Sequence, residues 1–127
     1  MRLLEYQAKE LFKEFGIRTP PSISSKDIEK GRKDAKELGY PFVIKVQVPV
    51  GGRGKAGGVK LIRDIADLEK EAKKMMGKFL ITHQTGPEGK EVKRLYIEEA
   101  SDIKKEFYLS CLIDRQSSKI AFIASTE

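Results

Sequence analysis

A glycine-rich, basic stretch between two β-rich runs constrains this chain more than any other feature of its sequence. Five glycines fall within the eight residues 51–58, and no Asp or Glu occurs from Leu38 through Arg63. Glycine lets backbone N–H groups approach a ligand closely, and a loop of such groups with cations beside it suits a polyphosphate. The alternative is a solvated basic hairpin without a ligand.

The run before the loop, residues 42–48, has the clearest strand pattern in the chain. Alternation places Lys45 in the middle of one face and apolar side chains on the other. Such a lysine is either a guard against aggregation on an edge strand or a phosphate ligand held by a rigid element, and the strand pattern leaves both open. After the loop, residues 59–62 resume β character.

Apolar residues at helical spacing, together with capping and stop signals, predict three amphipathic helices. Residues 24–27 form a capping signal for the second helix, and Asp64 caps the third. The helices are predicted over residues 3–15, 28–38 and 64–76. In the first helix, Leu11, Phe12 and Phe15 are interpreted as packing residues without chemistry.

The second half of the chain is predicted to be mostly β. Residues 79–90 read as irregular, and the strands are predicted over residues 92–97, 106–113 and 119–124. A turn at 114–118 joins the last two into a hairpin. Helices and strands do not alternate regularly along the chain, so the sequence predicts an α+β fold and not a doubly wound sheet.

Composition narrows the function classes. A formal net charge of +6 invites a nucleic-acid interpretation, but the basic residues are spread through helices that also carry Glu, and no aromatic residue interleaves with the glycine loop. No apolar run approaches the ~20 residues of a membrane span, so no membrane association is expected. Cys111 is the single cysteine, which favours a cytoplasmic location, and one cysteine with His83 excludes zinc sites built from several such ligands.

The segment from Gly52 to Gly57 matches the pattern G-x-G-x-x-G, which alone is weak evidence. A dinucleotide fingerprint needs a helix directly after the loop, whereas a strand at residues 59–62 is predicted here. A phosphate loop of the Walker type fails as well, because Ala56 stands where Ser or Thr is required. A strand, glycine loop and strand cover the phosphates of ATP in protein kinases, but the other kinase motifs are absent. This combination points to the ATP-grasp enzymes.

Four segments in order extend this interpretation: residues 4–12, 43–48, 51–60 and 121–127. Together they resemble the β subunits of succinyl-CoA synthetases of the ADP-forming type, and the similarity runs over all 127 residues. The resemblance implies a reversible ligase that converts succinate, CoA and ATP to succinyl-CoA, ADP and phosphate. It also implies an α subunit partner that carries the CoA site and a transiently phosphorylated histidine.

Other functions stay open beside this one. The β subunits of malate–CoA ligases are similar in the same segments, so the sequence does not identify the dicarboxylic acid substrate. It also does not distinguish ADP from GDP as the nucleotide. A function of a different class is a basic domain, without catalysis, that binds anions or nucleic acid through the net charge.

The resemblance also implies roles for individual residues. Lys45, Gly52, Arg53 and Gly54 would contact the phosphates of ATP or ADP. Glu98 would lie at the hinge near adenine with Ser101 beside it, and Glu106 would contact the ribose. From the residues alone, the acidic cluster around 98–106 is either this acceptor set or a solvated turn. No catalytic residue is assigned within the chain.

The magnesium ligands of the family, an Asn and an Asp, would lie beyond Glu127, so no metal ligand is assigned to this chain. We therefore expect a fragment: residues 21–101 as a complete first ATP-grasp lobe, and residues 1–20 and 102–127 as an incomplete second lobe. These residues alone are expected not to catalyse the ligase reaction, since Mg²⁺ neutralises much of the charge in phosphoryl transfer. Exposed strand edges and apolar faces in the second lobe are expected to cause self-association.

Overall fold

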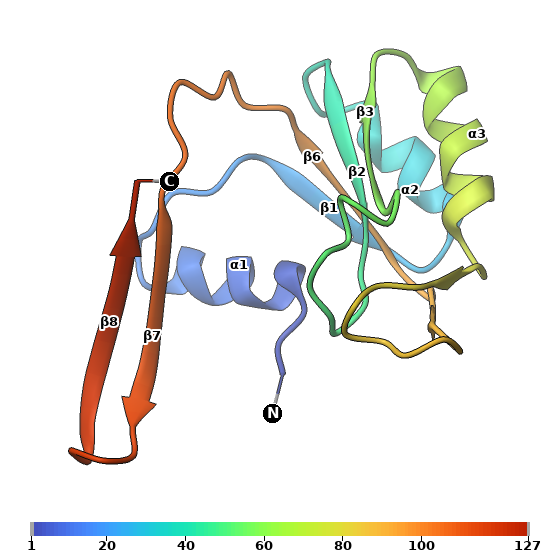
Figure 1. Ribbon diagram of the computed structural model, residues 1–127. Coiled ribbons are helices and arrows are strands. Elements are labelled where there is room, and N and C mark those ends of the chain that lie inside the picture. Colours follow the sequence, from blue (N-terminus) through green and yellow to red (C-terminus); the bar gives the residue numbers. More distant parts are fainter. Residues whose placement is uncertain (1, 127) are drawn as a thin grey trace.

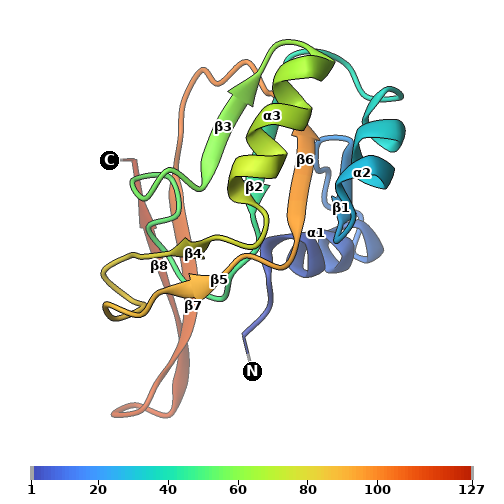
Figure 2. The same ribbon diagram turned by 90° about the vertical axis from the view of Figure 1, so that its right-hand side faces the viewer.

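A four-stranded antiparallel sheet organises the computed structural model, which describes residues 2–126 (Figure 1). Its strands, in spatial order, are β1 (Ser22–Ser25), β6 (Leu95–Glu99), β2 (Phe42–Val46) and β3 (Val59–Ile62). Helices α2 (Ile28–Ala35) and α3 (Ile65–Met75) cover one face of this sheet (Figure 2). Helix α1 (Glu5–Glu14) lies on the opposite face (Figure 1). The predicted mixture of helices and strands is therefore present.

The core lies between the sheet and the two helices. Phe42 and Ile44 are fully buried and Val46 is 1% exposed, as the alternation of β2 requires. From the helices, Leu68 and Ala35 complete the same cluster. The opposite face of β2 is thereby left to Lys45 and its neighbours, which lie toward α1.

The helix starts follow from their caps. The Asp27 side chain accepts a hydrogen bond from the N–H of Lys30 at 2.8 Å, and Asp64 accepts from Asp67 at 2.8 Å. Helix α2 ends at Ala35 and not at the predicted Leu38, because residues 36–38 tighten into bonds of the i to i−3 type.

Strand β1 was not predicted from the sequence, because its four residues are mostly serine and carry no apolar alternation. It exists through pairing with β6, in which Ile23 lies opposite Ile97. The ends of the predicted irregular segment 79–90 pair as two short strands, β4 (Phe79–Leu80) and β5 (Lys90–Glu91), the second of which extends one residue beyond the segment.

Strand β6 begins three residues later than the predicted strand at residue 92. The cause is Val92, whose N–H donates to the carbonyl of Lys78 and whose carbonyl accepts from Gly77, both at 2.8 Å. Val92 is thereby tied to the segment that follows α3 and not to β2.

The C-terminal hairpin lies apart from this sheet. Strands β7 (Tyr108–Asp114) and β8 (Lys119–Ser125) form the predicted hairpin, which stands beyond α1 (Figure 1). Phe107, Leu109, Ile120 and Phe122 are all between 66% and 71% exposed. Self-association through these side chains, and the division into lobes at 21–101, stay predictions.

The prediction that Leu11, Phe12 and Phe15 are packing residues is wrong for the contacts within residues 2–126. Their side chains are 40%, 44% and 82% exposed, and α1 buries no residue. The reason is that α1 meets the sheet through polar atoms: the N–H of Tyr6 donates to Gln47 Oε1 at 3.1 Å, and Glu5 and Lys9 form ion pairs. Among residues 2–126, no helix is long and apolar enough to cross a bilayer.

Candidate functional site

Lys45 lies on an internal strand, which excludes one of its two sequence interpretations. Strand β2 pairs with β6 on one side and β3 on the other, so Lys45 cannot guard a sheet edge. Its backbone lies opposite Tyr96 of β6, and its side chain is 19% exposed. The sheet therefore holds a half-buried lysine on a rigid element, with its ammonium group toward α1.

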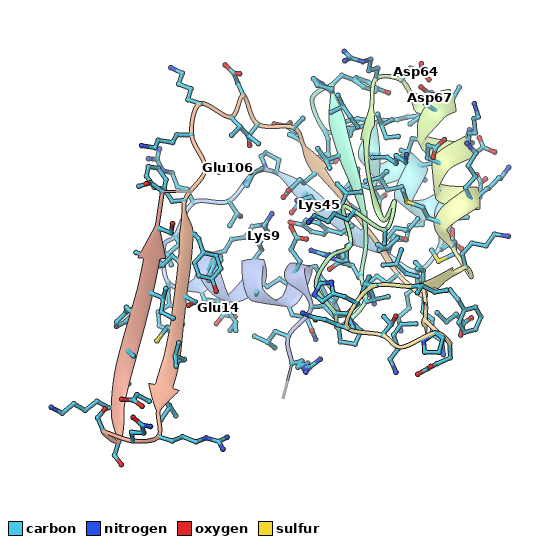
Figure 3. All side chains as sticks on the ribbon, in the orientation of Figure 1. Lys9, Glu14, Lys45, Asp64, Asp67 and Glu106 are labelled. Atoms are coloured by element: carbon cyan, nitrogen blue, oxygen red, sulfur yellow. The ribbon has the colours of Figure 1, made fainter. Side chains whose placement is uncertain are left out.

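Two carboxylates and three cations form an ion-pair network between α1 and the sheet, which we call the charge network. Glu5 Oε1 lies 2.9 Å from Lys45 Nζ and 3.1 Å from Lys9 Nζ, and Glu5 Oε2 accepts from Arg53 at 2.6 Å. The Glu98 carboxylate, 8% exposed, accepts from both lysines, one on each oxygen. In Figure 3, Lys9 and Lys45 extend from α1 and β2 into the same space.

The cations of the charge network control the protonation of Glu5. Burial raises the pKa of this carboxyl, but hydrogen bonds from Lys45 and Arg53 outweigh burial and lower the pKa from 4.5 to about 2. Glu5 is therefore ionised throughout the physiological range and behaves as a fixed negative charge among the cations.

Acid is expected to remove the stabilisation that Glu5 provides. Because its pKa is lower in the folded chain than in the unfolded one, this contribution is complete above pH 4.5 and is lost as the pH falls toward 2. After allowance for solvent screening, we expect a loss of about 1–2 kcal/mol. Urea unfolding of the wild type and of Glu5→Gln between pH 6 and pH 2.5 measures it. The difference between the two should shrink with acid, and a constant difference would contradict the assignment.

The glycine loop is shaped by specific glycines. Gly52 and Gly57 have φ of 76° and 77°, which favour glycine, and a Cβ on Gly58 would lie 2.6 Å from Val46 Cγ2. Gly54 differs, because its backbone is not left-handed and a Cβ there would meet nothing within 4 Å. The fold does not require glycine at this position, so Gly54 leaves space for a close ligand.

The loop also offers hydrogen-bond donors. Within residues 2–126, the N–H groups of Gly52, Arg53 and Gly54 donate to no protein acceptor, whereas that of Gly58 donates to the carbonyl of Arg53 at 2.7 Å. The Arg53 side chain turns back over the loop and donates to the carbonyl of Val46 at 2.8 Å as well as to Glu5. Cations and available N–H groups on one side of the sheet are suited to an anion with several oxygens.

The structure brings together only part of the predicted site. Lys45, Arg53 and Glu98 meet in the charge network, and Gly52 and Gly54 lie in the adjoining loop. Ser101 and Glu106 are exposed on the connection from β6 to β7 and take no part in the network. Figure 3 labels Glu106 on this connection. Glu98 contacts Lys45 and Lys9, and its position at the hinge near adenine stays a prediction.

Sequence reasoning missed Glu5 and Lys9. Their spacing of four residues was a usable signal, because such residues share one face of a helix and form a pair at 3.1 Å. Nothing in the local pattern indicated that this face meets β2. Within the described part of the chain, no three His, Cys, Asp or Glu side chains converge to hold a metal ion.

Comparison with known proteins decides the family. The sequence model of the ATP-grasp domain matches residues 2–127. The chain belongs to the ATP-grasp family. Among curated relatives, this ATP-grasp chain is 52% identical to the succinate–CoA ligase [ADP-forming] subunit beta of Pelagibacter ubique, with 100% of this chain and 33% of that protein covered. The chain thus spans about a third of that relative's length, and the predicted resemblance is confirmed.

Solved structures confirm the predicted α+β ATP-grasp fold. The ATP citrate lyase of Methanothrix soehngenii, in complex with citrate and coenzyme A, superposes with a TM-score of 0.74 at 20% identity, covering 99% of this chain and 32% of that one. The N5-carboxyaminoimidazole synthetase of Staphylococcus aureus, complexed with ADP, gives 0.64 at 28% identity, covering 94% and 27%. The first of these supports the fold alone.

Proposed function

We propose that this chain is the nucleotide-binding part of the β subunit of an ADP-forming succinate–CoA ligase. One observation carries the proposal: Lys45 Nζ and Arg53 Nη2 lie 2.9 Å and 2.6 Å from the two oxygens of a single carboxylate. The internal strand and the glycine loop thus direct two cations at one anionic group. A phosphate of ATP or ADP presents the same kind of group with more charge.

In this proposal the phosphates lie between β2 and the glycine loop. Lys45 and Arg53 provide charge, and the N–H groups of Gly52 and Gly54 provide donors that have no protein acceptor within residues 2–126. Ser101 and Glu106, exposed after β6, are the proposed contacts for the base and ribose. Glu98 on β6 is proposed to lie near the adenine while its carboxylate holds Lys9 and Lys45. Mg²⁺ would accompany the nucleotide and neutralise phosphate charge, with protein ligands supplied from outside these residues.

The relatives support the proposed reaction and partners. The shared name of the curated relatives favours succinate over malate as the acid. CoA and the phosphorylated histidine would belong to an α subunit that binds this one. We propose a cytoplasmic location, as the composition already suggests.

The nucleic-acid alternative is not favoured, because Lys45 and Arg53 are paired with carboxylates in a half-buried network and do not form an open basic surface. Calorimetric titration with ADP at 50 and 200 mM salt, followed by competition with RNA, distinguishes the two functions. We expect saturable ADP binding with a modest salt dependence. Binding that falls steeply with salt and is displaced equally well by RNA would contradict the proposal.

A further inference from the structure

Helix α1 brings a third cation to the anion site. Lys9 Nζ lies 3.1 Å from Glu5 Oε1, the oxygen that Lys45 Nζ approaches to 2.9 Å. Lys9 and Lys45 also share the Glu98 carboxylate, each donating to a different oxygen. The two lysine side chains are 18% and 19% exposed. The helix and the sheet therefore present two ammonium groups in matching surroundings, and only the one on the sheet was expected.

The surroundings of Lys9 restrain it. Its Nζ lies 5.2 Å from the centroid of the Tyr96 ring, a cation–π distance. Tyr96 is 2% exposed on β6, and burial raises its pKa to about 12. The phenol that contacts the lysine is therefore neutral in the physiological range. A lysine that is already restrained loses less conformational freedom when it binds an anion.

Glu5 has the contacts of a bound anion. Both of its oxygens face cations, which come from three different segments: α1, β2 and the glycine loop. Its side chain is 17% exposed, so these contacts are largely screened from water. A polyphosphate has more charge and more acceptor oxygens than a carboxylate, so the same cations favour it when it is present.

We propose that Lys9 is a third phosphate-binding cation, and that the Glu5 carboxylate holds the phosphate position until the nucleotide displaces it. This inference rests on the proposed function, because it makes α1 part of the same nucleotide site. With Glu5 displaced, Lys9, Lys45 and Arg53 face the polyphosphate, and Glu98 remains to orient the two lysines. Nucleotide binding thereby exchanges the ion pairs that hold α1 against the loop for contacts to phosphate.

Substitutions on α1 of the 127-residue chain test this, with ADP and inorganic triphosphate as separate titrants in calorimetry. Lys9→Met is expected to lower the affinity for both ligands about 10-fold. Lys9→Arg keeps the charge, so its affinities should stay within about threefold of the wild type. Glu5→Gln removes the competing charge and is expected to raise the affinity for both ligands about 10-fold.

Matched controls lie on the same helix. Lys13→Met and Glu14→Gln make the same charge changes at exposed positions outside the charge network, and Glu14 lies at the end of α1 away from Lys45 (Figure 3). Screening by salt should limit their effect on either ligand to less than about twofold.

The outcomes separate this inference from the proposed function. Suppose that ADP binding depends on Lys45. If ADP affinity is then unchanged in Lys9→Met, or lower in Glu5→Gln than in the wild type, the inference is overturned and the proposed function is retained. If the substitutions change triphosphate affinity as expected but the wild type does not bind ADP, the anion site is supported and the proposed function is overturned. Failure of the wild type to bind either titrant contradicts both. Should Lys9→Met fail to fold by circular dichroism, Glu5→Gln decides, with tighter binding in support and equal or weaker binding against.

Discussion

Replacing Lys45 with alanine is expected to weaken ADP binding by roughly 10- to 100-fold, since charge-assisted hydrogen bonds contribute about 1.5–3 kcal/mol each. The lysine is held on an internal strand, 2.9 Å from Glu5 and in direct contact with Glu98. Without it, Lys9 is the one cation among residues 2–126 that still pairs with Glu98, so the site also becomes more negative where a phosphate would lie. Calorimetric titration of the wild type and Lys45→Ala with ADP measures the change.

Lys60→Ala is the matched control for this variant. Lys60 lies on the neighbouring strand β3, opposite Ile44, and is exposed outside the charge network. The same loss of one positive charge should change ADP affinity less than about twofold, because an exposed charge is screened by salt. Equal losses in both variants would show that net charge, and not the site around Lys45, determines binding.

Replacing Phe42 with alanine is expected to lower the free energy of unfolding by about 3–4 kcal/mol, since large-to-small changes leave a cavity. Phe42 is fully buried at the start of β2, and its ring centroid lies 4.2 Å from that of Tyr40. The loss is a large part of the 5–15 kcal/mol that stabilises an ordinary domain. Because β2 carries Lys45, only the folded chain has the proposed site. At urea concentrations near the unfolding midpoint of Phe42→Ala, this variant should therefore bind ADP less well than the wild type.

Urea unfolding followed by circular dichroism measures this effect, with Phe15→Ala as the control. Phe15 is 82% exposed, so the same substitution should change the free energy of unfolding by less than about 0.5 kcal/mol. A similar loss in both variants would contradict the location of the core between the sheet and helices α2 and α3.

Several features of the fold could be predicted because their signals are local. The alternation of β2, the caps at Asp27 and Asp64, and the glycine loop each follow from residues within a few positions of one another. Excluding the edge-guard interpretation of Lys45 depended on one further fact, that β2 is internal. Pairing with β6, about fifty residues later in the chain, provides that fact, and no local pattern contains it.

The parts that were missed depend on contacts between distant segments. Strand β1 is a strand because β6 lies beside it, and its serine-rich sequence carries no signal of its own. Glu5 and Lys9 belong to the site only because α1 packs across β2, so that Glu5 meets a lysine forty residues away. The apolar positions of α1 gave a wrong packing prediction for the same reason, because polar atoms form the contact of this helix with the sheet.

The central claim is that ADP phosphates bind between β2, the glycine loop and α1. The most direct test is a titration of the ¹⁵N-labelled chain with ADP, followed through its backbone amide resonances. Our account predicts saturable shifts that are largest at Gly52, Arg53 and Gly54, whose N–H groups donate to no acceptor within residues 2–126. Shifts confined to the hairpin turn at 114–118 or to α3, or no saturable shift in residues 51–58, would contradict it.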